Sequence, residues 1–172
     1  MNLLLRLKWK IEGRVVRLLQ PYRSRRLYRR FVFPGSLCFD VGANMGERTA
    51  LFLELGARVV AVEPQPLCVE ALRNRFAGCG RFELVPEAVG AAEGRAEMLF
   101  STSHTLSTLS RTWMESVQKS GRFLGSEWTE RRSVNLTTLD RLIERFGAPD
   151  FVKIDVEGYE LDVLKGLSRG LP

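Results

Sequence analysis

The stretch FDVGANMG, residues 39–46, decides the fold that the sequence predicts. It completes a short apolar run that begins at Leu37, and it opens a run of helical periodicity that ends near Leu55. Glycine between a strand and a helix lets the backbone approach a ligand that a Cβ atom would obstruct, and the first helical turn presents free N–H groups. We therefore expect a nucleotide-like ligand at residues 42–46, called the bend below, because open α/β sheets bind such ligands beyond the carboxyl ends of their strands.

Apolar runs of strand length alternate with helical patterns on both sides of this bend. Strands separated by helices of about ten residues indicate βαβ crossovers and a mostly parallel sheet. The strands are predicted at residues 37–41, 58–62, 82–85 and 151–155, and the helices at 46–55, 67–76, 138–146 and 159–167. The middle is less regular, with short strands expected at 96–100 and 134–136, a polar loop at 101–110 and a helix at 112–119. A chain of 172 residues has the length of one such domain.

Two acidic residues at predicted strand ends narrow the kind of ligand. Asp40 lies two residues before Gly42, and Glu63 follows the second predicted strand, 21 residues after Gly42. A carboxylate at position 40 would repel a pyrophosphate and suit a cationic amino-acid group, whereas one at position 63 can accept hydrogen bonds from both ribose hydroxyls. The two acids favour S-adenosylmethionine over NAD as the cofactor. The alternative is that Asp40 only caps the following helix and that Glu63 is an exposed turn residue.

Five blocks of sequence, taken in order, resemble the FkbM-type methyltransferases. They are FDVGANMGERT at 39–49, VVAVEPQP at 59–66, EAVG at 87–90, TTLDRL at 137–142 and KIDVEGYELDVLKG at 153–166. The resemblance covers residues 37–169, and the last block is its most specific part. It implies a class I methyltransferase fold, which is a Rossmann-like, doubly wound, seven-stranded α/β sheet. It also implies methyl transfer from S-adenosylmethionine to a hydroxyl oxygen of a small metabolite, sugar or lipid-like acceptor.

The resemblance also assigns roles to residues by their positions in the matching blocks. The methionine end of the cofactor would lie at the bend, its ribose at Glu63 and its adenine at residues 87–88. The cofactor-binding residues expected on this basis are Asp40, Gly42, Ala43, Asn44, Gly46, Glu63, Glu87 and Ala88.

Asp155 and Glu157 follow the last predicted strand, and the resemblance places them toward the methyl group. A hydroxyl must lose its proton as it attacks, and a carboxylate within hydrogen-bond reach can accept that proton. Asp155 is the first candidate for this catalytic base and Glu157 the second. The alternatives are that they orient the hydroxyl or bind a divalent cation, or that Asp155 contacts only the cofactor. No metal site is expected, because two acids alone hold a metal poorly.

Two further residues lie near the predicted site. Lys153 points to the opposite face of its strand from Ile154 and is interpreted as structural. His104, the single histidine, lies in the Ser- and Thr-rich loop at 101–110. It belongs either to the acceptor site or to a solvated loop.

Basic residues are concentrated at the start of the chain. Residues 1–33 contain ten Arg or Lys and one Glu, a charge of +9 within a chain of net charge +6. Apolar residues recur at helical spacing across residues 2–19, which predicts an amphipathic helix. We expect a helical extension at 1–33 and a methyltransferase domain at 34–172. Three interpretations of the extension stay open: a helix packed on the domain, a peripheral membrane contact with Trp9 in the headgroup layer, and a nucleic-acid contact, for which no specific module is recognised.

The cysteines and the C-terminal end of the sequence add further expectations. Three cysteines without a CxxC spacing predict neither a disulfide framework nor a zinc site, so a reducing, cytoplasmic location is expected. The sequence stops at Pro172, whereas the class I fold adds three more strands after the fourth. We therefore expect an incomplete domain, which is either a truncated polypeptide or one whose open edge strand is covered by another subunit of a homo-oligomer.

The sequence leaves open two alternatives to an O-methyltransferase. One is a non-catalytic or degenerate methyltransferase-fold module that binds the cofactor and associates with membranes. The other is a NAD-dependent oxidoreductase, against which Asp40 and the incomplete glycine pattern argue.

Overall fold

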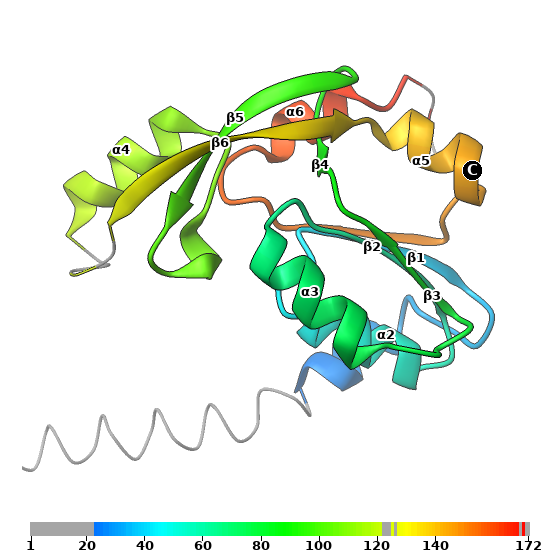
Figure 1. Ribbon diagram of the computed structural model, residues 1–172. Helices are drawn as coiled ribbons and strands as arrows, with labels where there is room; N and C mark the ends of the chain where they lie inside the picture. Colours follow the sequence, from blue (N-terminus) through cyan, green and yellow to red (C-terminus); the bar gives the residue numbers. More distant parts are fainter. Residues whose placement is uncertain (1–22, 122–124, 126, 169, 171–172) are drawn as a thin grey trace, which may run out of the picture.

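The computed structural model describes residues 23–121, 125, 127–168 and 170. Its centre is a four-stranded parallel sheet with the order β3-β2-β1-β7 (Figure 1). Strands β1 and β2 are buried along almost their whole length, which explains why they appear in the sequence as continuous apolar runs. The strands are β1 (Leu37–Val41), β2 (Arg58–Val62), β3 (Phe82–Val85) and β7 (Phe151–Ile154).

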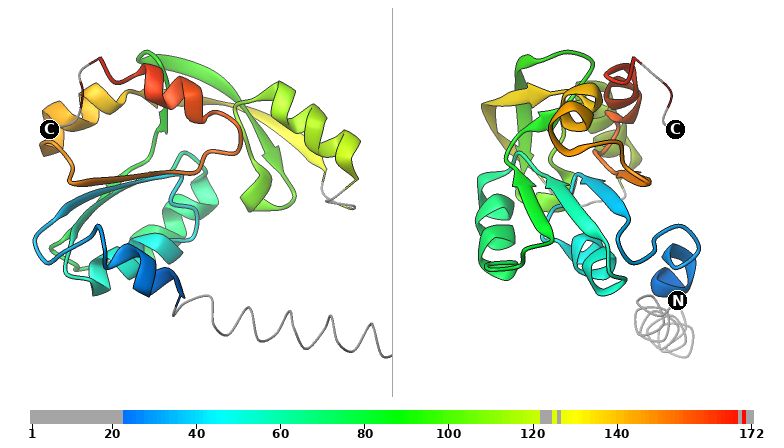
Figure 2. Two further views of the ribbon diagram at one scale, coloured as in Figure 1. Left: turned by 180° about the vertical axis from the view of Figure 1, so that it is seen from behind. Right: turned by 90° about the vertical axis from the view of Figure 1, so that its right-hand side faces the viewer.

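Helices cover both faces of this sheet (Figures 1 and 2). Helix α5 (Leu139–Phe146) begins after Thr138, whose hydroxyl oxygen caps the helix by accepting a 3.1 Å hydrogen bond from the backbone N–H of Arg141. The predicted Rossmann-like, doubly wound α/β fold is confirmed. On one face lie α2 (Glu47–Glu54) and α3 (Pro66–Arg75), and on the other lie α5 (Leu139–Phe146) and α6 (Glu160–Lys165).

The strand order reverses between β1 and β7. From β1 the chain crosses to β2 and then β3 on one side, and β7 pairs with the opposite side of β1. At such a switch point the connections after the two central strands diverge and leave a crevice at the carboxyl edge of the sheet. Gly42 follows β1 and Asp155 follows β7, so both residues lie at this point.

A second sheet, which the sequence predicts only in part, joins the central one. Strand β4 (Ala88–Val89) pairs parallel with β6 (Trp128–Thr137), and β6 pairs antiparallel with β5 (Gly94–Ser101). Strand β4 is absent from the sequence prediction, and β5 and β6 are longer than the predicted runs. Most of β6 is exposed and polar, so its sequence carries no apolar run. The connection from β5 to β6 contains η1 (His104–Leu106) and α4 (Arg111–Ser120).

Residues 23–28, at the start of the described chain, are helical. The helix predicted at 2–19 lies outside the described residues, and the division at residue 33 stays a prediction. None of the helices in the described part of the chain has the length and hydrophobicity needed to cross a bilayer. Strand β7 forms one edge of the central sheet among the described residues, and its coverage by a second copy also stays a prediction.

Candidate active site

A cavity of about 890 Å³ lies at the carboxyl ends of β1, β2 and β7. Its position is the crevice that the reversal of strand order creates. Asp40 and Gly46, two of the predicted cofactor-binding residues, are not part of its wall. Eight of the predicted site residues line it: Gly42, Ala43, Asn44, Glu63, Glu87, Ala88, Asp155 and Glu157.

The glycines of the bend make room mainly for the protein's own chain. Gly42 has a φ of 73°, and a Cβ atom there would lie 2.0 Å from the backbone oxygen of Asp155. Gly46 has a φ of 81°, and a Cβ atom there would lie 2.7 Å from the side chains of Leu72 and Phe76. The missing Cβ of Gly46 therefore accommodates Leu72 and Phe76, and its contact with the cofactor stays a prediction. Gly42 lines the cavity, yet its missing Cβ accommodates the chain after β7.

Glu63 joins the end of β2 to the bend. Its Oε2 accepts a 2.8 Å hydrogen bond from the backbone N–H of Asn44, and its Oε1 accepts one of 2.9 Å from that of Gln65. The residue is 2% exposed, so the alternative of an exposed turn residue is wrong. Burial raises the pKa of Glu63, and the hydrogen bonds from Gln65 and Asn44 oppose that rise. The Gln65 side chain contributes a third hydrogen bond, and since a carboxylate can accept about four, Glu63 keeps capacity to accept one from a ligand.

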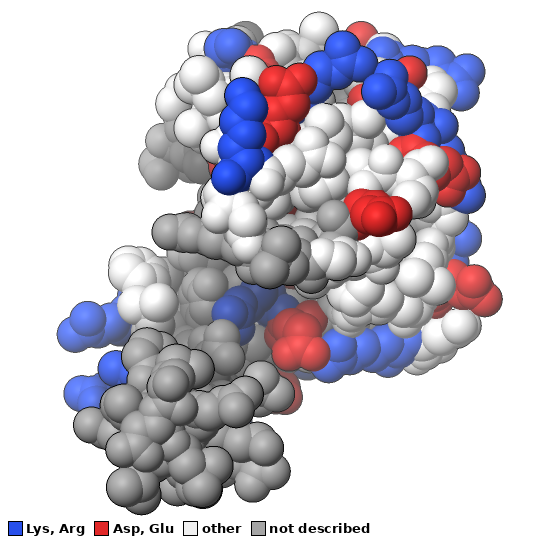
Figure 3. Space-filling view, turned by 90° about the vertical axis from the view of Figure 1, so that its left-hand side faces the viewer, with Lys and Arg blue, Asp and Glu red and all other residues white. Residues whose placement is uncertain are grey.

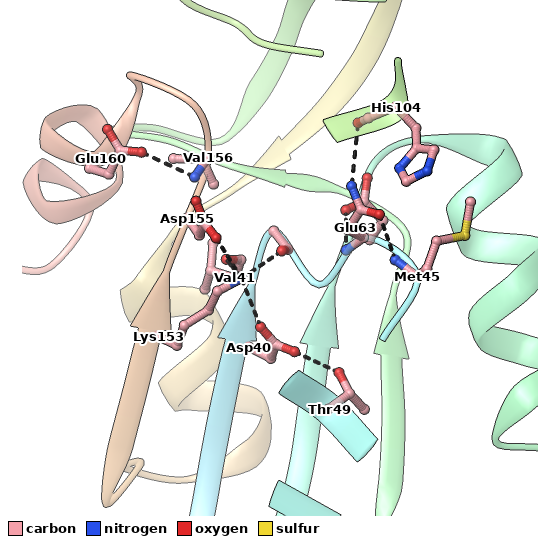
Figure 4. Close-up of polar contacts among 12 residues, drawn as sticks. Asp40, Val41, Met45, Thr49, Glu63, His104, Lys153, Asp155, Val156 and Glu160 are labelled. Carbon is pink, nitrogen blue, oxygen red and sulfur yellow. Dashed lines mark hydrogen bonds and ion pairs between the residues drawn. The ribbon is translucent and has the colours of Figure 1, made fainter. Parts of the chain in front are cut away.

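Asp40 lies behind the cavity wall and is fully buried. Its Oδ2 accepts a 2.6 Å hydrogen bond from the hydroxyl of Thr49 in α2, and its Oδ1 lies 3.1 Å from Lys153 Nζ (Figure 4). The ammonium group of Lys153 already pairs with this carboxylate behind the cavity wall, and the contact of Asp40 with a cationic group of the ligand stays a prediction. The helix-cap alternative is wrong, since the N-cap of α2 is Gly46 and no side chain caps that helix.

Lys153, which the sequence places among structural residues, reaches into the site. Its Nζ donates a 2.7 Å hydrogen bond to the backbone oxygen of Gly42 and lies 3.7 Å from Asp155 Oδ2 (Figure 4). It therefore connects buried Asp40, the bend and the segment after β7. The register explains the contact, because Asp40 and Lys153 are paired on neighbouring parallel strands and so share one face of the sheet; the sequence alone carries no signal of this pairing.

The turn after β7 carries the two candidate catalytic acids. The Asp155 side chain is 65% exposed, and Glu157 adopts the left-handed conformation with a φ of 54°. The hydroxyl of Thr108 donates a 2.7 Å hydrogen bond to the backbone oxygen of Glu157. Glu160 Oε1 accepts hydrogen bonds of 3.1 and 3.2 Å from two backbone N–H groups of the same turn. These contacts hold Glu157 in a conformation that residues other than glycine rarely adopt.

The surroundings of Glu157 raise its pKa to about 6. Burial is the largest cause, the negative charges of Asp155 and Glu160 add to it, and Lys153 opposes it. A carboxylate with a pKa in this range is a better proton acceptor near neutral pH than an ordinary glutamate. The pKa of Glu157 therefore suits a proton acceptor, and the choice of base between Asp155 and Glu157 stays a prediction.

His104 belongs to the cavity wall. Its backbone oxygen accepts hydrogen bonds from Asn44 Nδ2 at 3.3 Å and from Gln65 Nε2 at 3.0 Å, so η1 is tied to the bend and to the end of β2. Its Nδ1 is buried and has no hydrogen-bond partner among the described residues. The solvated-loop interpretation is wrong, and the ring offers a polar atom to a ligand. Within the same described residues, no three His, Cys, Asp or Glu side chains gather as a metal site.

Residues 40–172 match a protein-family model that is described as the methyltransferase FkbM domain. The chloroplastic ribosomal RNA small subunit methyltransferase of Arabidopsis thaliana is 32% identical over 65 residues, which are 38% of this chain and 19% of that protein. This chain therefore spans about a fifth of the length of that curated relative.

Two solved structures are also similar to parts of this chain. A putative rRNA-methylase from Clostridium thermocellum has a TM-score of 0.35 and 19% identity, with 38% of this chain and 39% of that chain covered. A 1,6-didemethyltoxoflavin-N1-methyltransferase from Burkholderia thailandensis, solved with 1,6-didemethyltoxoflavin and S-adenosylhomocysteine, has a TM-score of 0.34 and 28% identity. That alignment covers 49% of this chain and 38% of that chain.

Proposed function

The chain belongs to the methyltransferase FkbM domain family, and from this premise we propose that it binds S-adenosylmethionine in the cavity and methylates a hydroxyl oxygen of a small metabolite, sugar or lipid-like acceptor. The observation that carries the proposal is the convergence of Glu63, the bend and the Asp155–Glu157 turn on one cavity at the switch point. Parallel α/β sheets bind nucleotide-like ligands at that position.

The residues of the cavity fit this cofactor. Glu63 supplies a carboxylate that can accept a hydrogen bond from a ribose diol, and the bend contributes the wall for the methionine end. Residues 87–88 line the cavity after β3, where the adenine is expected. The buried Nδ1 of His104, which has no partner among the described residues, gives the same cavity one more polar atom that a ligand can satisfy.

The residues around the acceptor have little chemistry to perform. S-adenosylmethionine, when bound, supplies a methyl group that is already electrophilic. The protein must align the acceptor with it and remove the hydroxyl proton as the new bond forms. We assign the proton to the carboxylate of Glu157 and the orientation of the acceptor to Asp155. Thr108 and Glu160 act as positioning residues, because their hydrogen bonds fix the turn that carries both acids.

If Glu157 is the base, turnover should depend on the protonation state of its carboxylate. Protonation removes the base, so turnover should rise as the pH increases through about 6 and then level off. Replacing Glu157 with Gln should remove this dependence and lower turnover at neutral pH by about 100-fold or more. The measurement is the pH profile of S-adenosylhomocysteine release in the presence of a panel of hydroxylated metabolites, sugars and lipids.

Asp155→Asn is the informative control for this profile. Because the charge of Asp155 raises the pKa of Glu157, its removal should keep the dependence and shift it to lower pH. A profile that survives Glu157→Gln but disappears with Asp155→Asn would return the role of base to Asp155.

The cofactor itself is tested by calorimetric titration with S-adenosylhomocysteine and, separately, with NAD. Binding of the first and not of the second is expected. Glu63→Gln should raise the Kd for S-adenosylhomocysteine by about 10- to 100-fold, because one acceptor atom of the ribose site is replaced by an amide donor. Glu83→Gln, an exposed glutamate of the neighbouring strand β3, should leave the Kd unchanged. Tight binding without methyl transfer to any acceptor would favour the non-catalytic module.

A further inference from the structure

Residues 23–33 are held on the domain mainly by Tyr28 and Val32, and Phe31 stacks on Phe151 with ring centroids 6.1 Å apart. Tyr28 packs edge-on against Phe52, with ring centroids 5.0 Å apart, and against Phe151 at 5.8 Å. Val32 is buried, and its N–H donates a 2.8 Å hydrogen bond to the backbone oxygen of Tyr28. This anchoring fixes which side chains of the segment face outward.

Three large apolar side chains of this segment are at least half exposed, although one of them, Phe31, also stacks on Phe151. Leu27 is 50% exposed, Phe31 is 51% exposed and Phe33 is 56% exposed. Leu27 and Phe31 are four residues apart, the spacing that places two side chains on the same side of a helical turn. Single exposed apolar residues are ordinary, whereas three within seven positions form a patch of the kind that marks an interaction site.

Basic side chains surround this apolar patch. Arg23, Arg25, Arg26, Arg29 and Arg30 are all exposed, and the described residues 23–33 contain no acid. Arg25 lies 3.6 Å from Glu54, while the other four form no ion pair among the described residues. In Figure 3, basic side chains project at the lower left.

We propose that residues 23–33 dock the protein on an acidic lipid surface. Arginines attract anionic headgroups, and the apolar side chains enter the boundary between headgroups and acyl chains. A nucleic acid would use the arginines but would gain nothing from burying Leu27, and a second copy of the basic segment would meet like charge. A bilayer with acidic lipids satisfies both features at once.

Docking through residues 23–33 would also affect the cavity, because this segment contributes to the cavity wall. Ser24 and Arg25 belong to the wall of the same cavity as Glu63 and Asp155. Docking through residues 23–33 therefore places one side of the cavity near the lipid surface, where a lipid-like acceptor would be found. This consequence rests on the proposed function, whereas docking itself is measured without cofactor or acceptor.

The test is co-sedimentation of the full chain with vesicles of phosphatidylcholine, alone and mixed with phosphatidylglycerol. Binding to the mixed vesicles, weakened by salt, is expected. The triple variant Arg26→Gln, Arg29→Gln, Arg30→Gln should bind them about 100-fold less, because each arginine near an acidic surface contributes a factor of about five.

The control has the same change in charge at exposed positions elsewhere: Arg73→Gln, Arg95→Gln and Arg111→Gln. It should bind like the unmodified chain, and equal binding by the two triple variants would overturn the proposal. Equal binding to vesicles with and without phosphatidylglycerol would overturn it as well.

The apolar contribution is tested by Leu27→Ser combined with Phe33→Ser. This variant should lose the part of vesicle binding that persists at high salt, while its far-ultraviolet circular dichroism stays unchanged. If the same variant instead dissociates a dimer of the unmodified chain and leaves vesicle binding intact, the patch is an interface between copies and the proposal is wrong.

Discussion

Replacing Lys153 with Met is expected to lower the free energy of unfolding by about 3–5 kcal/mol, because it leaves the carboxylate of Asp40 buried without its cation. Asp40 is fully buried, and apart from Lys153 its one polar partner among the described residues is the hydroxyl of Thr49. Lys153 is itself nearly buried, and its loss also removes the 2.7 Å hydrogen bond to the backbone oxygen of Gly42. The measurement is urea unfolding monitored by circular dichroism.

A double-mutant cycle separates the ion pair from the packing of the lysine side chain. Asp40→Asn combined with Lys153→Met should be less destabilising than the sum of the two single changes, because no unpaired charge remains in the double variant. The amide oxygen of the substituted side chain can still accept the hydrogen bond from Thr49. Additive effects would show that the pair contributes nothing beyond the two side chains taken separately.

A matched control is available on the surface of α6. Lys165 lies 2.8 Å from Asp162, and both side chains are substantially exposed. Lys165→Met should therefore change the free energy of unfolding by less than about 1 kcal/mol, as is usual for exposed pairs. A loss of comparable size in the two lysine variants would mean that burial of the Asp40 pair is not what makes Lys153 important.

The strands of the central sheet could be predicted because both of their faces are covered. Such strands appear as short apolar runs, and the runs at 37–41, 58–62 and 151–155 agree with β1, β2 and β7 to within one residue. The polar strand β6 leaves no such run, because its stability comes from pairing with β5 and not from burial on two sides. The sequence therefore predicts the second sheet only in part.

The residues of the candidate site likewise include some that could be predicted from the sequence and some that could not. Spacing along the chain places Glu63 and the bend at strand ends, and both line the cavity. The same spacing could not show that Asp40 faces α2, or that Lys153, 113 positions later, supplies the cation that Asp40 pairs with. Such cross-strand partners depend on the order of strands in the sheet, which becomes known only when β7 is placed beside β1.

Replacing Gly42 with Ala should lower the free energy of unfolding by about 3–5 kcal/mol, since left-handed backbone strain and overpacking act together. The new Cβ would lie 2.0 Å from the backbone oxygen of Asp155 and 3.0 Å from its carbonyl carbon. Backbone atoms cannot rotate aside as a side chain can, so β1 and β7 would have to separate where the two candidate acids begin. Thermal and urea unfolding measure the loss, and S-adenosylhomocysteine binding should weaken in parallel.

Gly78 supplies the control that separates strain from collision. Its φ of 75° matches the 73° of Gly42, but a Cβ atom at Gly78 would meet nothing within 4 Å. Gly78→Ala should therefore cost only the left-handed strain, about 1–2 kcal/mol, and leave cofactor binding unchanged. If the two variants unfold alike, the close approach of the chain after β7 is not what requires glycine at position 42. The requirement would then be the turn alone, and Gly42→Asn, which tolerates positive φ but adds the same Cβ, should be accepted there.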